Sequence, residues 1–328
     1  MRFDVIVGNP PYQEGDSGHA KSAAPIYQHF FRQAIALRPR SICMIIPARW
    51  FAGGKGLGSF RKEMLEDKNI RLVDDFPNAS IVFEEVQIKG GVSIVVRAEH
   101  PTSEMTIISN LDPNQPVSFT RDHLAPDRDV FIRFPMAESV LGKVLEPPRP
   151  AEETTPLMDE LVSVRRPFGL GAGERGDPGA SEENSLLLHH KGGRARILSD
   201  RIASGSNLAA AWKIFIPRLA SGSDKFPHPV LGRAFIGAPG EVCTETYLAI
   251  GPFLSEESAI NAKSYIDTRI FRYLCLLRKS SQDTPRTVFK FAPVQNFLQS
   301  WSDEKLIERY RISTDEWQEI EKLVSRLP

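Results

Sequence analysis

Four residues that follow a short apolar run are the ones whose types and order could do chemistry. Residues 3–7, FDVIV, predict a strand buried on both faces, and the chain continues through Gly8 into Asn9, Pro10, Pro11 and Tyr12. The prolines lack a backbone N–H and have a fixed φ, and Pro11 also keeps Pro10 extended. The sequence therefore predicts a stiff loop at the carboxyl end of a strand, the edge where open α/β sheets bind ligands.

A rigid loop with these side chains suits a flat ligand with polar edges. Asn9 offers one acceptor and two donors, and Tyr12 offers a ring for stacking. A nucleobase has both properties that this pair would recognise. The alternative interpretation is a turn that ends a strand and carries one surface tyrosine.

The stretch Val7–Tyr12, VGNPPY, resembles the catalytic motif of amino-group methyltransferases that use S-adenosylmethionine. Further segments resemble one family among these enzymes, the adenine-specific DNA methylases of restriction–modification systems. Within it, the methylase part of combined restriction-and-modification enzymes is the most similar. The resemblance covers nearly the whole chain, and the other segments that carry it are Lys21–Tyr27, Ile45–Gly56, Thr244–Phe253 and Arg278–Trp301.

This resemblance implies site-specific methyl transfer from S-adenosylmethionine to N6 of an adenine that is flipped out of duplex DNA. It assigns catalysis to Asn9, Pro10, Pro11 and Tyr12, and it places Asn9 beside the cofactor as well. The Asn9 side-chain oxygen and the Pro10 carbonyl would accept the two amino hydrogens. Tyr12 and Phe83 would stack on the base, although a phenylalanine packed inside a hairpin is the alternative for Phe83. The resemblance implies no metal.

The elements that must position this motif alternate between strands and helices. They predict an α/β fold in which residues 1–115 form the second half of a doubly wound, Rossmann-like methyltransferase sheet. Residues 116–328 are expected to form an α+β DNA-recognition domain with C-terminal helices, one of them long and capped by Ser255. In the first part, strands are predicted at 3–8, 41–47, 71–75 and 91–96, and helices after Pro25 and at 60–67.

The helix after Pro25 is expected to be amphipathic. Ile26, Phe30, Ala34 and Leu37 recur at a spacing that places them on one face, so this face is predicted to be buried.

One part that the family would have is missing from the pattern. Its cofactor-binding strands precede the catalytic motif, whereas this chain begins two residues before the motif's strand. Most of the S-adenosylmethionine site is therefore expected to be absent, as in the C-terminal portion of a larger enzyme or a truncated reading frame. The segment Phe168–Gly173, FGLGAG, resembles a cofactor loop only superficially. It follows Arg-Arg-Pro instead of a strand, which favours a loop of the recognition region.

Composition is that of a globular protein, with 328 residues of which 41% are hydrophobic and 25% charged. The three cysteines are far apart and form neither a disulfide framework nor a zinc spacing, and the adjacent pair His189-His190 is not a metal spacing. The sequence shows no signal-peptide pattern and no apolar run of membrane-spanning length. A cytoplasmic location without membrane contact is therefore expected.

The formal net charge is zero, but the charge is unevenly distributed. Residues 186–235 contain eight lysines and arginines against Asp200 and Asp224, which leaves this segment at about +6. Such a segment predicts a surface that follows DNA phosphates, and a solvated face is the alternative. The residues expected to contact DNA are Lys191, Arg194, Arg196 and Arg201, together with Lys55 in the glycine-rich stretch 53–56.

Double-stranded DNA is the expected partner, and a restriction endonuclease domain or subunit is a second candidate. Three other functions stay open. A protein glutamine methyltransferase shares Asn-Pro-Pro-Tyr, but more than 200 residues beyond the predicted sheet argue against it. A cytosine N4 methylase would usually begin the motif with serine, whereas this chain has Asn9. A catalytically incomplete DNA-recognition fragment is the third.

Overall fold

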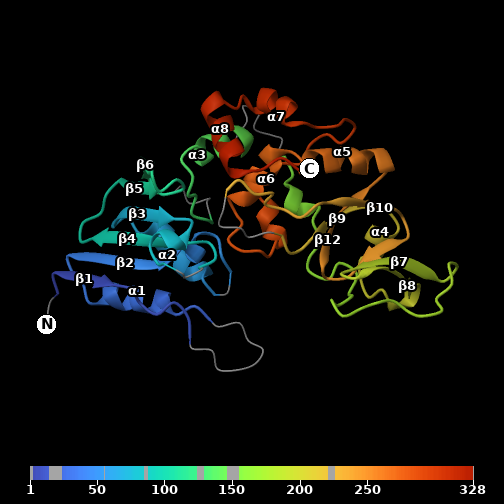
Figure 1. The fold of residues 1–328 in the computed structure, drawn as a ribbon, viewed down its shortest axis with the longest axis horizontal. Coiled ribbons are helices and arrows are strands. Elements are labelled where there is room, and N and C mark those ends of the chain that lie inside the picture. Colours follow the sequence, from blue (N-terminus) through green and yellow to red (C-terminus); the bar gives the residue numbers. More distant parts are fainter. Residues whose placement is uncertain are drawn as a thin grey trace. The chain divides into compact units, whose positions relative to one another are not determined.

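The computed structural model describes residues 3–14, 24–54, 56–84, 88–123, 129–145, 155–220 and 226–327. The chain forms two compact units, Met1–Ala137 and Glu138–Pro328. Both contain helices and strands, so the expected α/β class is confirmed (Figure 1). No helix among these residues is long and apolar enough to cross a membrane.

The first unit is built on a six-stranded mixed sheet with the order β1-β2-β4-β3-β5-β6. The first pair is parallel, and β4 lies antiparallel between β2 and β3. β3 and β5 are parallel, and β6 returns antiparallel to β5. The strands are β1 (Val5–Gly8), β2 (Ser41–Pro47), β3 (Ile70–Phe76), β4 (Val92–Ala98), β5 (Glu104–Ser109) and β6 (Val117–Asp122).

One face of this sheet carries the core. On β2 the side chains of Ile42, Met44 and Ile46 are buried and alternate with half-buried ones, as the two-residue period of a strand requires. The helices α1 (Tyr27–Ala36) and α2 (Gly58–Glu66) contribute their buried side chains to the same cluster. The 3₁₀ helices of this unit are η1 (Ala48–Phe51) and η2 (Ala79–Ile81). The doubly wound arrangement, which would place helices on both faces, stays a prediction.

The prediction that β1 is buried on both faces was wrong. β1 is an edge strand of the sheet, and Val5 and Val7 are 57% and 75% exposed. Among the described residues no strand pairs with its outer edge. An apolar run predicts that a strand forms, but it does not reveal whether a neighbour covers each side.

The buried face of α1 agrees with the prediction at Ala34, which is buried, but differs from it elsewhere. Phe30 is 43% and Leu37 50% exposed, whereas Tyr27 and Phe31 are buried against the ring of Phe60. Two interleaved apolar stripes run along this helix. Packing against Phe60 of α2 buries the stripe that contains Tyr27 and Phe31. The helical period alone does not show which of the two stripes is buried.

The first compact unit extends beyond the segment 1–115 expected for the catalytic part, because β6 completes its sheet and Phe131 packs against Phe51 and Trp50. The functional division near residue 115 stays a prediction.

The second unit contains two three-stranded sheets, with the orders β10-β9-β12 and β11-β7-β8. Their strands are β7 (Ser185–His190), β8 (Gly193–Leu198), β9 (Trp212–Pro217), β10 (Phe235–Gly237), β11 (Glu241–Cys243) and β12 (Tyr247–Phe253). The helices are α3 (Ala137–Leu145), α4 (Ser206–Ala209), α5 (Glu256–Ile266), α6 (Arg269–Leu276), α7 (Asp303–Tyr310) and α8 (Thr314–Leu323), with 3₁₀ helices η3 (Met158–Glu160), η4 (Ser199–Arg201) and η5 (Arg286–Phe289).

The long helix expected after Ser255 is two helices. Ser255 caps α5 as predicted, but α5 ends at Ile266 and Thr268 caps α6 by accepting a hydrogen bond from the Phe271 N–H at 3.1 Å. A threonine inside an apolar helical pattern competes for backbone groups in this way, and here the cap starts a second helix.

Candidate active site

The Asn-Pro-Pro-Tyr loop leaves the carboxyl end of β1, as the sequence predicts. Pro10 is buried, whereas Asn9 is exposed directly after the strand. The loop is then fixed by the segment that leads into α1. The Tyr12 carbonyl accepts a hydrogen bond from the Ile26 N–H at 3.2 Å, and Gln13 forms a β-bridge with Pro25. Tyr12 is therefore anchored through its own backbone.

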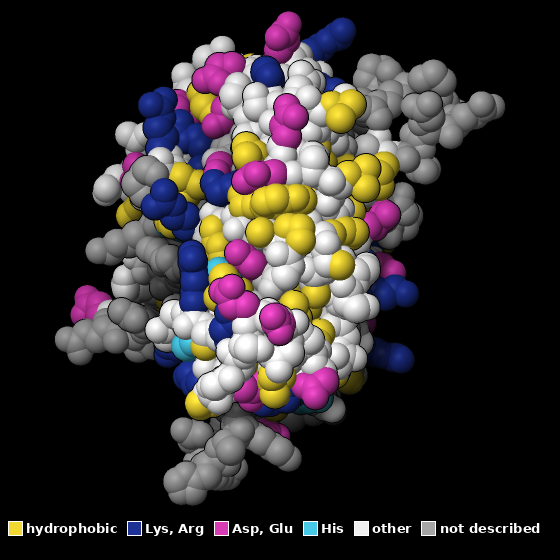
Figure 2. All heavy atoms as spheres, turned by 90° about the vertical axis from the view of Figure 1, so that its right-hand side faces the viewer, with side chains coloured by type: hydrophobic (Ala, Val, Ile, Leu, Met, Phe, Trp, Pro, Cys, Tyr) yellow, Lys and Arg dark blue, Asp and Glu magenta, His cyan; other side chains and the backbone are white. Residues whose placement is uncertain are grey.

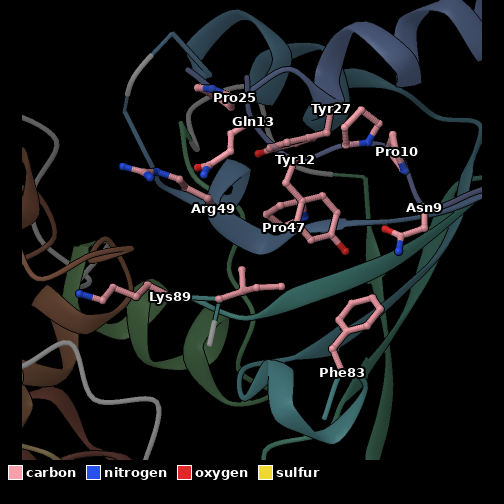
Figure 3. A pocket seen from close by; sticks show the side chains of 12 residues that line it. Asn9, Pro10, Tyr12, Gln13, Pro25, Tyr27, Pro47, Arg49, Phe83 and Lys89 are labelled. Atoms are coloured by element: carbon pink, nitrogen blue, oxygen red, sulfur yellow. The ribbon is translucent and has the colours of Figure 1, made fainter. Parts of the chain in front are cut away.

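A pocket of about 740 Å³ opens beside this loop, within the size range of small-molecule sites. Asn9, Pro10, Pro11 and Tyr12 all line it. Figure 3 shows the side chains of Asn9, Tyr12 and Phe83 around one end of the space. The structure thus brings the four motif residues and Phe83 into a single site. The other lining residues are Gln13, Pro25, Tyr27, Pro47, Arg49, Ile88 and Lys89.

Tyr12 and Phe83 form the aromatic part of the pocket. Their ring centroids are 6.5 Å apart and the ring planes lie at 69° to each other. Phe83 is held just after η2, because its N–H donates to the Ala79 carbonyl at 2.9 Å. Burial raises the pKa of Tyr12 to about 12, so its hydroxyl stays protonated at neutral pH. That hydroxyl is buried and has no hydrogen-bond partner among the described residues.

The opposite side of the pocket is formed by the end of β2 and by the turn before β4. Arg49 lies in η1, directly after β2, and Lys89 lies in the turn. The turn is held by a buried ion pair in which Arg133 donates to Asp75, with N–O distances of 2.5 and 2.8 Å, while another of its nitrogens donates to the Gly90 carbonyl at 3.1 Å. Sequence reasoning missed both cations of the pocket, although Arg49 lies inside the resembling segment Ile45–Gly56.

Glycine is required at one position of this turn. Gly91 has φ of +81°, and a Cβ there would lie 2.0 Å from the Phe76 carbonyl oxygen. The Gly91 carbonyl accepts a hydrogen bond from the Ala48 N–H at 3.0 Å, which joins the turn to η1 and thus to Arg49. The close packing of these backbones fixes the cationic side of the pocket.

Of the residues expected to contact DNA, Lys55 lies outside the described residues. The other four lie around the β7–β8 hairpin of the second unit. Lys191 and Arg194 are exposed at its turn. Arg196 is ion-paired with Glu182, and Arg201 is ion-paired with Glu174 at 2.6 Å and with Asp177 at 2.5 Å.

These ion pairs make the region around the hairpin less positively charged than its own sequence suggests. Counting residues 186–235 alone omits the carboxylates of the preceding loop, which neutralise two of the four candidate arginines and lysines. On the face drawn in Figure 2, acidic side chains also lie among the basic ones. Contact with DNA through any of the four stays a prediction.

The glycine-rich segment Phe168–Gly173 has a structural role in the second unit. The carboxylate of Glu245 accepts hydrogen bonds from Arg165 and Arg166 at 2.8 and 2.9 Å and from the Ala172 N–H at 3.2 Å. These hydrogen bonds lower the pKa of Glu245 to about 2. The loop follows no strand and opens no helix, so it lacks the geometry of a cofactor loop.

The histidines and cysteines form no metal site within the part of the chain that the structure describes. His189 contacts Glu241 at 2.7 Å and packs against Phe215 and Phe235 in the core of the second unit. Lys213 is buried beside it and donates to three backbone carbonyls, with burial lowering its pKa to about 8. These groups stabilise the interior of the unit.

The first unit carries the Asn-Pro-Pro-Tyr pocket on a mixed sheet. Comparison with known proteins confirms its resemblance to restriction–modification methylases. Residues 1–83 match the family model described as Eco57I restriction-modification methylase. Over 95 residues the chain is 37% identical to an uncharacterized adenine-specific methylase from Mycoplasma pneumoniae, which corresponds to 28% of this chain and 22% of that protein. The alternative functions considered above are not favoured by these matches.

Two similar solved structures are also restriction enzymes. One is the type IIG restriction endonuclease BpuSI, with a TM-score of 0.38, 12% identity and coverage of 94% of this chain and 49% of that one. The other is the type IIL restriction-modification enzyme MmeI in complex with DNA, with a TM-score of 0.46, 10% identity and coverage of 86% and 45%. The chain thus spans less than half of these enzymes and under a quarter of the curated relative.

Proposed function

We propose that this chain binds and orients the target base of a site-specific DNA methyltransferase that modifies N6 of adenine with S-adenosylmethionine. The observation that carries the proposal is the pocket at the end of β1, where Asn9, Pro10, Tyr12 and Phe83 converge. The family match over residues 1–83 supports the reaction class.

Methyl transfer requires that the protein hold the amino group of adenine in an orientation from which its nitrogen can attack the methyl group. The lone pair of adenine's amino nitrogen is delocalised into the ring, so the nitrogen is a poor nucleophile until its hydrogens are fixed. In our proposal the Asn9 side-chain oxygen and the Pro10 carbonyl accept these two hydrogens. The exposure of Asn9 at the end of β1 leaves it accessible to a ligand. Most of the rate enhancement from this chain would then come from positioning.

Stacking supplies the other part of base capture. Tyr12 and Phe83 present rings on the same side of the pocket, and base–aromatic stacking contributes about 1–3 kcal/mol per base. The backbone of Tyr12 is held by its hydrogen bond from the Ile26 N–H, so the loop that carries the ring is already ordered before a base enters.

We propose that the described residues supply little of the site for S-adenosylmethionine. The donor would have to approach Asn9 from beyond β1, where no described strand continues the sheet. The one glycine-rich segment that resembles a cofactor loop is bound to Glu245 in the second unit. The proposal therefore assigns to this chain the binding of the amine, and it assigns the donor site to residues other than those described.

We further propose that the second unit reads duplex DNA, and that a restriction endonuclease domain or subunit works with the methylase. Lys191 and Arg194 support the first point, because they are exposed at a hairpin turn and, unlike Arg196 and Arg201, form no ion pair with another described residue. Such an enzyme would act in the cytoplasm on cellular DNA.

Two variants of an enzyme that carries this sequence test the proposal. Asn9→Ala removes an acceptor aimed at the amino group, so it should abolish most transfer of radiolabelled methyl groups to genomic DNA and leave DNA binding intact. Tyr12→Ala removes a stacking surface, so it should weaken both base capture and turnover. Phe30→Ala, which truncates an exposed aromatic side chain on α1, is the matched control. Full methyl transfer by the Asn9 variant would contradict the proposed role of the loop.

A further inference from the structure

The pocket has two chemically different ends. Asn9, Tyr12 and Phe83 lie at one end, and the side chains of Arg49 and Lys89 extend away from them with their charged ends on the same side (Figure 3). An occupant with a flat base at one end and a negative group at the other would match both ends. A nucleotide has this form.

The guanidinium of Arg49 forms no ion pair with an acidic side chain among the described residues. Its Nε is buried and makes no hydrogen bond. Three other arginines of the same unit form ion pairs with acidic side chains. Arg32 pairs with Glu63, Arg97 with Asp67 and Arg133 with Asp75. Because an unpaired buried donor is unfavourable, a donor left open at a pocket points to a ligand that completes its hydrogen bonds.

The backbone around Arg49 is built to keep this side chain in place. The Gly53 N–H donates to the Arg49 carbonyl at 2.7 Å, and Arg61 donates to the Gly53 carbonyl at 2.6 Å. A Cβ at Gly53 would lie 2.7 Å from the Arg49 Cγ. Glycine at this position therefore leaves room for the stem of Arg49.

We propose that Arg49, assisted by Lys89, binds the DNA backbone phosphate next to the nucleotide whose base enters the pocket beside Tyr12 and Phe83. This inference rests on the proposed function and adds a positioning group to it. The guanidinium fork matches the oxygens of a phosphate and can donate two parallel hydrogen bonds. A phosphate held at this end fixes the sugar–phosphate backbone while the base rotates into the pocket.

The test uses the full chain and a deoxytrinucleotide with 2-aminopurine as its central base. Each of its two phosphates is replaced in turn by an uncharged methylphosphonate, and binding is followed by quenching of the 2-aminopurine fluorescence. The parent protein should bind one of the two substituted probes about tenfold or more weakly than the unmodified probe, as expected for the loss of a charge-assisted contact. Arg49→Ala should bind all three probes equally weakly.

Two further variants distinguish the effect of the guanidinium fork from that of positive charge and from a general loss of structure. Arg49→Lys keeps the charge without the fork and should fall between the parent and Arg49→Ala. Arg40→Ala removes an exposed arginine that precedes β2, at the opposite end of the strand, and should bind like the parent. Circular dichroism spectra of the variants should match that of the parent.

The outcomes distinguish this inference from the proposed function. If Tyr12→Ala abolishes quenching but neither methylphosphonate weakens binding to the parent, the phosphate site is wrong and the base pocket stands. The same holds if Arg49→Ala still discriminates among the probes. If the parent binds none of the probes, or if Tyr12→Ala leaves quenching unchanged, both inferences are overturned.

Discussion

Removal of Arg133 should destabilise the first unit strongly, because it leaves a charge without a partner in the interior. The Asp75 side chain is completely buried, and Arg133 donates to both of its oxygens. Breaking a buried ion pair by deleting one member costs about 3–5 kcal/mol. The guanidinium also lies 5.1 Å from the centre of the Phe51 ring and holds the Gly90 carbonyl. We therefore expect Arg133→Ala to lose about 3–5 kcal/mol at pH 7.

The loss of stability in Arg133→Ala should be larger at high pH than at low pH. Burial raises the pKa of Asp75, and Arg133 opposes this rise, so the pKa lies higher in the variant. A carboxyl whose pKa is higher in the folded than in the unfolded state binds more protons when folded. Stability of the variant should thus fall as the pH rises through the interval between these two pKa values, and it should recover as the pH is lowered.

Hydrogen exchange of the full chain measures this locally. Peptides from β3 and β4 should lose protection in Arg133→Ala after correction for intrinsic exchange rates, while peptides from the second unit serve as the internal control. The double variant with Asp75→Asn should recover part of the loss, because it removes the uncompensated charge. Unchanged protection in Arg133→Ala at pH 7, or a deficit that is the same at pH 5 and 8, would refute this account.

Two other predictions concern ligands. Calorimetry should detect weak or no binding of S-adenosylmethionine to this chain alone if, as proposed, the described residues supply little of its site; micromolar affinity would show that the chain holds the cofactor after all. If the β7–β8 turn contacts two phosphates of duplex DNA, replacing Lys191 and Arg194 with alanine should reduce the slope of log affinity against log salt by about 1.8, at roughly 0.9 per contact. Arg196→Ala should change the slope less, because this arginine is already paired with Glu182, and equal changes for all three residues would contradict the distinction.

Predictions from the sequence were most accurate for features that depend only on neighbouring residues in the chain. Two prolines after an apolar run define a stiff loop at a strand end whatever surrounds it, so Asn9 and Tyr12 were placed correctly. The Ser255 cap was also found from local rules. Phe83 could be linked to Tyr12 only through the family resemblance, because 70 residues lie between them in the sequence.

The wrong predictions concern features that depend on residues far away in the sequence. Whether β1 has a neighbour on its outer side depends on other strands, and which stripe of α1 is buried depends on Phe60. The charge of the β7–β8 hairpin depends on Glu174 and Glu182, which precede it in a loop. Arg49 was overlooked because nothing in its neighbours along the chain shows that its guanidinium lacks a partner.

The exposed edge of β1 has a consequence for the colloidal behaviour of this chain. Edge strands of soluble proteins are commonly protected by lysine, proline or a bulge, whereas β1, VIVG, has only small and apolar residues and exposes Val5 and Val7. The formal net charge of zero adds no long-range repulsion between molecules. The exposed edge of β1 is therefore a site at which copies of this chain are expected to associate.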